Sequence, residues 1–226
     1  FQPSLYRAPL DNDMYLKYVW HKEGLNHISW IKKKCAYEQT GDTVVISAVY
    51  RLKTCSYRNA GTFKVKYTIN ALGRIAVDYS YKNLVFKLVP RLGMLVEMPK
   101  TYSNITYFGC DAESLSDFKE HAVIRRVTTN VDAMHTPYIK PQESGMRYNT
   151  FYAQVTDENG TGFRFESETP FVFNANPYNA EQISKATHKE DLLKYDTTNV
   201  QIDGYMLGAG SNACGPIPTK AHRKVM

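Results

Sequence analysis

Four carboxylates, Glu97, Glu113, Asp117 and Glu143, are the side chains through which this 226-residue chain could cleave a glycosidic bond. Such cleavage needs two carboxyl groups about 5–9 Å apart on either side of the sugar. The spacing of these four residues along the sequence pairs no two of them. From the residues alone, the prediction is therefore a soluble all-β protein that could bind a sugar.

Three other groups of residues that could bind a ligand fit simpler structural roles. Residues 11–13 (DND) lack the regularly spaced oxygen donors of a calcium loop, so capping by Asx turns is favoured. Residues 208–211 (GAGS) are not followed by Gly-Lys-Ser/Thr and open no helix, which excludes a nucleotide loop. For His188, at the end of a predicted helix, a structural hydrogen bond is favoured over catalysis.

The excess of positive charge is the main hint of an anionic partner. The chain has 28 Lys and Arg against 22 Asp and Glu, a formal net charge of +6. Its one compact basic run is residues 32–34 (KKK), and no helix-turn-helix, zinc-finger or RNA-binding signature accompanies this run. A solvated face is therefore favoured, and nucleic acid is not expected among the partners.

The four cysteines have no C-x-x-C spacing, which argues against a structural zinc site. Cys35 and Cys55 could face each other on neighbouring strands, but free thiols in a reducing compartment are favoured. No stretch approaches the roughly 18 apolar residues of a membrane span. We therefore expect a cytoplasmic protein without a membrane partner.

Alternating apolar and polar residues indicate that strands dominate the fold. The pattern is clearest over residues 43–54, 63–70 and 75–82, which with two hairpin-length turns predict an antiparallel meander from 34 to 83. Further strands are expected at 90–98, 105–108, 123–129, 151–156, 161–166 and 200–207, and short helices at 14–25 (ending at Gly24) and 180–188. Residues 1–13 predict an ordered loop. Many short strands with few helices indicate an all-β sandwich.

Residues 134–150 form the segment around which this organisation is built. Pro137 and Pro141 each fix φ and remove a backbone donor, and Gly145 allows a turn through positive φ. We call this segment the connector. It is expected to be stiff, to enter a strand over 147–156, and to hold two sheets in a fixed relation.

Five motifs in order give the chain a family resemblance. They are residues 7–13 (RAPLDND), 90–93 (PRLG), 136–147 (TPYIKPQESGMR), 187–192 (THKEDL) and 203–210 (DGYMLGAG). Together they resemble the C-terminal small-chain domain of large β-galactosidases of glycoside hydrolase family 2. The resemblance covers nearly the whole chain.

The resemblance implies a β-supersandwich with the galactose-mutarotase-like fold, forming a single domain over residues 1–226 that is truncated at both ends. It implies hydrolysis of terminal non-reducing β-D-galactosides with retention. In the family, the catalytic glutamates and the ligands of magnesium and sodium lie in a (β/α)-barrel outside this segment. No catalytic residue, metal ligand or cofactor is therefore expected here, and the fragment alone should be inactive. The implied partners are that barrel, the galactoside and further copies of the parent enzyme in a homo-oligomer.

The resemblance also implies a position for the substrate. The loop after Gly210 is similar to one that borders the pocket on the side of the leaving group, which makes Asn212 and Cys214 the expected substrate-binding residues. Cys214 stands where well-known members offer a tryptophan, and a thiol supplies no aromatic face. Residues 109–117 also depart from the family pattern, lacking its proline and aromatic, so only Glu113 and Asp117 are carried over, as structural positions.

Two other functions stay open. The 17 tyrosines and the sandwich pattern also fit a stand-alone galactose-binding module. Fold analogy alone allows a mutarotase-like enzyme that uses a histidine and a carboxylate for acid–base chemistry.

Overall fold

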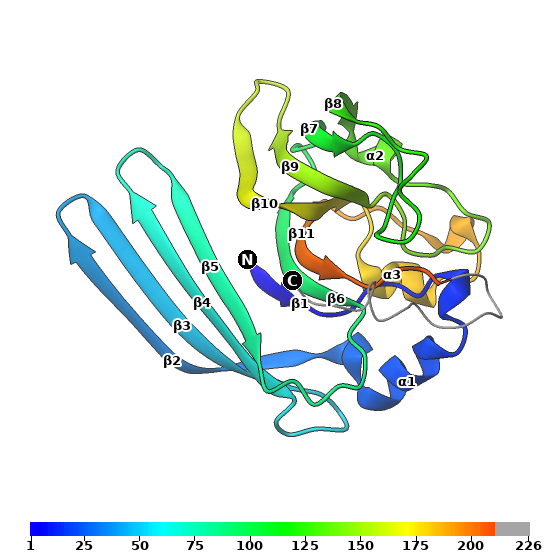
Figure 1. The fold of residues 1–226 in the computed structure, drawn as a ribbon, viewed down its shortest axis with the longest axis horizontal. Coiled ribbons are helices and arrows are strands. Elements are labelled where there is room, and N and C mark those ends of the chain that lie inside the picture. Colours follow the sequence, from blue (N-terminus) through cyan, green and yellow to red (C-terminus); the bar gives the residue numbers. More distant parts are fainter. Residues whose placement is uncertain (211–226) are drawn as a thin grey trace. The chain divides into compact units, whose positions relative to one another are not determined.

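The computed structural model describes residues 1–210. Its strands pair only in antiparallel fashion, in one sheet of seven strands and one of four, and its helices are short, which confirms the predicted all-β class. Contacts divide the chain into two compact units, Tyr18–Leu88 and Phe1–Lys17 with Val89–Met226. We call them the four-stranded unit and the seven-stranded unit (Figure 1). That residues 1–226 act as one domain stays a prediction.

The seven-stranded sheet has the order β1-β6-β11-β10-β9-β7-β8. Its strands are β1 (Gln2–Ser4), β6 (Arg91–Pro99), β7 (Asn104–Cys110), β8 (Ile124–Asn130), β9 (Arg147–Thr156), β10 (Gly162–Asn176) and β11 (Thr197–Met206). The helices of this unit are α2 (Val131–Met134) and α3 (Ala180–Lys185), with 3-10 turns η1 (Asp11–Asp13) and η3 (Lys189–Asp191). The strands predicted from alternation at residues 90–166 and 200–207 are thus all present.

Two hydrophobic clusters support this sheet. In the larger one, alternate residues of the strands, such as Tyr107, Phe173 and Val200, pack with Val131 and Met134 of α2. The smaller cluster is made by Leu115, Met146, Val172 and Met206. Val172 and Phe173 are neighbours in β10 and belong to different clusters, as expected for a strand whose successive side chains point to opposite faces.

The four-stranded unit is the predicted meander. It contains β2 (Ser29–Thr40), β3 (Thr43–Lys53), β4 (Gly61–Asn70) and β5 (Ile75–Lys82), paired in sequence order, together with α1 (Leu16–Glu23) and the 3-10 turn η2 (Leu25–His27). Gly24 has φ +75° and ends α1, as predicted. On one face of the sheet, Phe63 lies 5.0 Å from Tyr81 between ring centroids. That face is aromatic, with Tyr50 and Tyr79 also around Phe63.

Three predictions about elements were wrong. The connector does not join two sheets, because β8 and β9 on either side of it belong to the same sheet; the division falls near residue 88 instead. Residues 1–13 include strand β1, where Pro3 is tolerated because an edge strand needs fewer backbone donors. Strand β10 continues to Asn176 past an irregularity between Glu166 and Phe171, which hides the alternation.

Residues 1–210 contain no helix long and apolar enough to cross a membrane. Within the same range, no three His, Cys, Asp or Glu side chains are grouped as metal ligands would be. Cys35, Cys55 and Cys110 are free thiols.

Because Phe173 is fully buried in the larger cluster, Phe173→Ala should lower the free energy of unfolding by about 3–5 kcal/mol. The same change at Phe163, which is 46% exposed on the same strand, should cost less than about 1 kcal/mol. Urea denaturation of both variants measures the difference. Equal losses would mean that this face of β10 does not carry the core.

Candidate functional site

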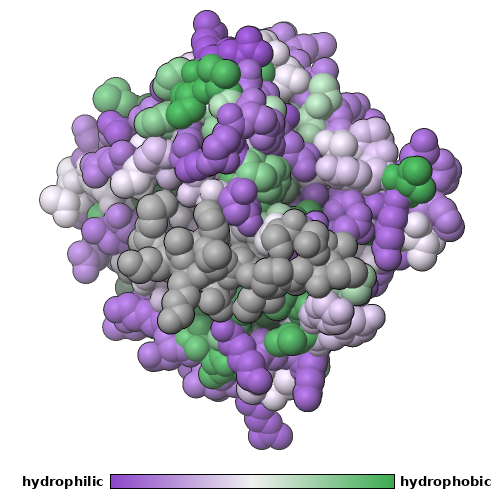
Figure 2. Space-filling view, turned by 45° about the vertical axis from the view of Figure 1, so that its right-hand side comes forward, coloured by the Kyte–Doolittle hydropathy of each residue, from purple (hydrophilic) through white to green (hydrophobic). Residues whose placement is uncertain are grey.

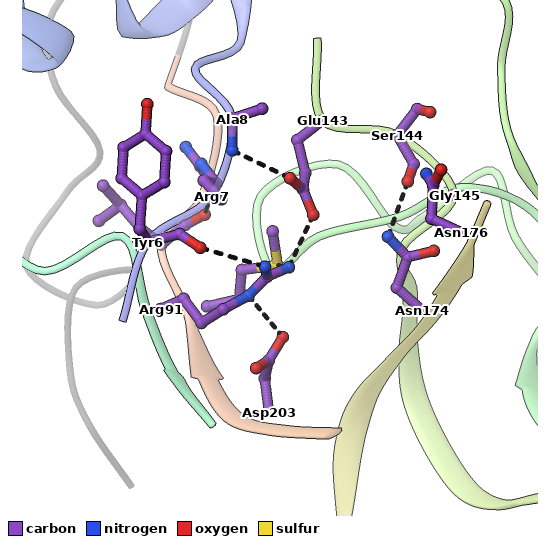
Figure 3. Close-up of polar contacts among 12 residues, drawn as sticks. Tyr6, Arg7, Ala8, Arg91, Glu143, Ser144, Gly145, Asn174, Asn176 and Asp203 are labelled. Atoms are coloured by element: carbon purple, nitrogen blue, oxygen red, sulfur yellow. Dashed lines mark hydrogen bonds and ion pairs between the residues drawn. The ribbon is translucent and has the colours of Figure 1, made fainter. Parts of the chain in front are cut away.

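Four of the five sequence motifs meet at a buried ionic cluster in the seven-stranded unit. Arg91, at the start of β6, donates from Nε to Asp203 Oδ2 of β11 at 2.9 Å and from Nη2 to Glu143 Oε1 of the connector at 2.7 Å. Its Nη1 donates to the carbonyl of Tyr6 at 3.3 Å, and the Ala8 amide donates to Glu143 Oε2 at 3.0 Å. Figure 3 shows Arg91 between the two carboxylates. The N-terminal segment, β6, the connector and β11 are thereby tied at one guanidinium.

The charges in this cluster do not balance, since one guanidinium faces two carboxylates. The pKa of Arg91 is raised: burial opposes the charge, but Asp203 and Glu143 outweigh burial. Burial raises the pKa of Asp203 to about 7, with Glu143 adding to the rise and Arg91 opposing it. Asp203 Oδ1 is buried without a hydrogen-bond partner in the described residues. The cluster therefore favours protonation of Asp203 below this raised pKa.

A second buried pair holds the segment that follows β11. Arg7 binds Asp13 through Nη2 at 2.9 Å, and both side chains are almost completely buried. The same guanidinium donates to the carbonyls of Leu207 and Gly208. Asp13 also accepts from the Leu10 amide at 2.8 Å. Asp13 thus caps the turn η1 through the amide three residues earlier, not through the Asx turn expected of residues 11–13, and it orients Arg7.

Asp117 binds the backbone amides of the same segment. Its Oδ1 accepts from the Ala209 amide at 3.0 Å and its Oδ2 from the Gly210 amide at 2.8 Å. A Cβ on Gly208 would stand 2.4 Å from Asp117 Oδ2, so only glycine permits this approach. Carbonyls 207 and 208 and amides 209 and 210 are thus fixed by side chains of opposite charge. We call residues 207–210 the anchored segment.

Before β9 begins at Arg147, the connector is held by side chains instead of strand pairing. Glu113 Oε2 accepts from Thr136 Oγ1 and from the Gly145 amide, both at 2.9 Å. Asn174 Nδ2 donates to the carbonyl of Ser144 at 2.8 Å (Figure 3). The stiffness expected from the two prolines is supplemented by these bonds, which fix the turn at Gly145, where φ is +85°.

His135, near the start of the connector, is hydrogen-bonded within this arrangement. Its Nδ1 is 3.2 Å from both Ser144 Oγ and Asn176 Nδ2. An amide nitrogen only donates, so Nδ1 accepts and the ring proton stands on Nε2. Burial lowers the pKa of His135. The ring is a neutral structural acceptor, which gives the acid–base reading of a histidine no support here.

The structure separates the four carboxylates named from the sequence. Glu143 joins the Arg91 cluster, Glu113 the connector and Asp117 the anchored segment, while Glu97 is exposed and accepts from Gln2. The backbone bonds of Glu113 and Asp117 fit the structural positions expected for them. Sequence reasoning gave Arg91 and Asp203 no role. A charge inside an otherwise apolar strand was the available signal, because buried charges need partners.

His188 is placed differently from the prediction. It precedes the 3-10 turn η3 and does not end α3, which stops at Lys185. Asp191 Oδ2 accepts from the His188 amide at 2.9 Å and from the Thr187 hydroxyl at 2.8 Å. The expected structural role thus belongs to Asp191 and to the backbone of His188. Asn212 and Cys214, the expected substrate-binding residues, lie outside the described residues.

Comparison with known proteins shows to which family the chain belongs and which proteins it resembles. The family described as "Beta galactosidase small chain" matches residues 1–225, and the chain belongs to that family. A protein named beta-galactosidase from Actinobacillus pleuropneumoniae is 29% identical over 94% of this chain and 21% of its own length. Proteins of the same name from Staphylococcus xylosus and Streptococcus thermophilus are 25% and 29% identical over 97% and 92% of the chain. The chain spans about a fifth of the length of these relatives.

The Arg91 cluster predicts a pH dependence of stability. Because the folded-state pKa of Asp203 is raised to about 7, its contribution to stability is present below its unfolded pKa and is lost as pH rises. The difference in the free energy of unfolding, wild type minus Asp203→Asn, should fall between about pH 4 and pH 7, with a slope of up to about 1.4 kcal/mol per pH unit. Urea titrations across this range test it. A difference that rises with pH would contradict the assignment of the proton.

Loss of the Asp117 carboxylate should release the anchored segment. Asp117→Asn leaves one amide facing an NH₂ group and should cost about 1–3 kcal/mol of unfolding free energy. Hydrogen exchange should speed up at the amides of residues 209 and 210. The control is Asp196→Asn, whose carboxylate makes only an exposed pair with Lys100 and should cost less than about 1 kcal/mol. Unchanged exchange at 209 and 210 would refute the anchoring role.

Proposed function

We propose that this chain is the C-terminal part of a family 2 β-galactosidase that hydrolyses terminal non-reducing β-D-galactosides with retention of configuration. Family membership supports this, as do the names of the relatives, of which the chain corresponds to about a fifth. In this proposal the chain shapes one wall of the substrate pocket and docks on the catalytic barrel. The catalytic glutamates, magnesium and sodium belong to that barrel.

The observation that carries the proposal is the anchored segment. Arg7 and Asp117 fix its carbonyls and amides, and it ends two residues before Asn212 and four before Cys214. A pocket wall must be positioned before substrate arrives, because misplacement by about 1 Å lowers rates severely. The proposed role of Asn212 and Cys214 on the leaving-group side depends on this fixed start.

The buried charged residues of the chain favour a structural role over a catalytic one. Arg91 and Asp203 are completely buried and Glu143 almost so, whereas a glycosidase pair must reach the sugar. Their part is to lock the N-terminal segment, the connector and β11 together. The β-supersandwich arrangement and assembly of the parent enzyme into a homo-oligomer are further parts of the proposal. So is a cytoplasmic location, which the free thiols support.

Hydrolysis of a nitrophenyl β-galactoside tests the proposal directly. The chain alone should be inactive, and activity should return when it is mixed with the remainder of its parent polypeptide. Arg7→Met should reduce the restored activity at least about tenfold, because the buried Asp13 loses its counter-charge and the anchored segment its donors. Arg125→Met, in an exposed pair with Asp111, is the matched control.

Other outcomes would decide for the alternatives. Hydrolysis by the chain alone would refute the assignment of catalysis to another part. No hydrolysis in the mixture, with both pieces folded, would refute the proposal; galactose binding measured by calorimetry would then support a binding module. Accelerated mutarotation of fresh α-galactose, followed by polarimetry, would support an epimerase.

A further inference from the structure

The charge of the chain is concentrated in the four-stranded unit. Residues 18–88 contain 12 Lys and Arg against 4 Asp and Glu, a formal net charge of +8. The whole chain carries +6, so the remaining residues together carry −2. One unit therefore accounts for all of the excess positive charge.

Register places half of this charge on one face of the sheet. Lys34, Val49, Lys64 and Ser80 are consecutive partners across β2, β3, β4 and β5. Partners in adjacent antiparallel strands point to the same face, and so do residues two apart along a strand. The cations on this face are Lys34, Arg51, Lys53, Lys64, Lys66 and Lys82, against the acids Glu38 and Asp78. We call it the basic face.

The cations of the basic face make no ion pairs within the described part of the chain, although Lys66 is the register partner of Asp78. None of the six makes an ion pair there, and all but the half-buried Arg51 are exposed. Arg51 Nε is buried without a hydrogen-bond acceptor in that same range. Like charges close together on a sheet destabilise it. The face is thus matched to a surface that supplies carboxylates.

The side chains of the basic face favour a folded protein surface over single-stranded nucleic acid. The aromatic residues of β2–β5 lie on the opposite face, with Phe63 and Tyr67 on β4 pairing with Tyr50 and Ile46. Small side chains such as Ala36, Ser47 and Val49 fill the spaces between the cations. Single-stranded nucleic acids are bound through rings on which bases stack, and this face offers none. Basic and without aromatic rings, the face suits an acidic protein surface.

On the face of the molecule drawn in Figure 2, hydrophilic residues predominate and hydrophobic residues form small separate groups. About four fifths of each relative's length lies outside the region matched by this chain. We infer that the basic face of β2–β5 docks on an acidic surface of the remaining part of the parent enzyme. This inference rests on the proposed function and names the surface through which the chain would dock.

Variants of equal charge change test the inference. The basic-face variant is Lys34→Gln/Lys64→Gln/Lys66→Gln, and the control is Lys140→Gln/Lys185→Gln/Lys189→Gln, three exposed lysines of the seven-stranded unit. Each chain is titrated against the remainder of the parent polypeptide, and Kd is read from restored galactoside hydrolysis and from calorimetry. The basic-face variant should bind about tenfold more weakly and the control no more than about twofold. Raising salt from about 0.05 M to about 0.5 M should weaken wild type more than the basic-face variant.

The remaining outcomes separate this inference from the proposed function. Restored hydrolysis with the same Kd for both variants would overturn the inference and leave the proposed function standing. A random-sequence DNA duplex is the second probe. If it binds wild type but not the basic-face variant, while assembly is unchanged, the face belongs to nucleic acid and the inference is overturned. Absence of hydrolysis from the wild-type mixture would overturn both.

Discussion

The seven-stranded unit depends on one buried guanidinium. Arg91 collects a carboxylate from β11, a carboxylate from the connector and a carbonyl from the N-terminal segment, which are far apart in sequence. Burying a charge is costly unless it is paired, so each of these segments is tied to the position of the others. The second pair, Arg7 with Asp13, extends this order to the carbonyls that follow β11. Apolar packing fills the sheet, whereas these charges determine where the irregular segments lie.

This dependence explains why the recognisable motifs are mostly outside the regular strands. Glu143 and Gly145 belong to the part of the connector that precedes β9, and Gly208 follows the last strand. A core position tolerates several apolar residues of similar volume. A carboxylate that accepts hydrogen bonds from two amides, or a glycine in contact with that carboxylate, cannot be replaced by another residue type without losing these contacts. Specific residue types are therefore required where the backbone is fixed by side chains.

The sequence predicted the strands better than their assembly. Alternation located the meander and most strands, because a half-buried strand needs apolar and polar residues at alternate positions of the sequence. It did not reveal that β1 pairs with β6, or that the connector stays within one sheet, because both depend on contacts between distant segments. The carboxylates were visible, yet their partners were not: Glu143 and Asp203 lie 60 positions apart and meet only through Arg91. The family motifs indicated which residues matter, and the structure showed which partners they bind.

The four-stranded unit is one uninterrupted stretch of chain, while the seven-stranded unit is built from two stretches on either side of it. During synthesis, β2 to β5 are complete before β6 emerges, and β1 must wait for a partner about 90 residues later. The inserted unit can thus form from local pairings while the host sheet is still incomplete. Non-local pairing is slow to form, so closure of the host sheet should be the late step in folding. An insertion of this kind also marks a natural boundary at which one module can be exchanged without breaking a strand of the other.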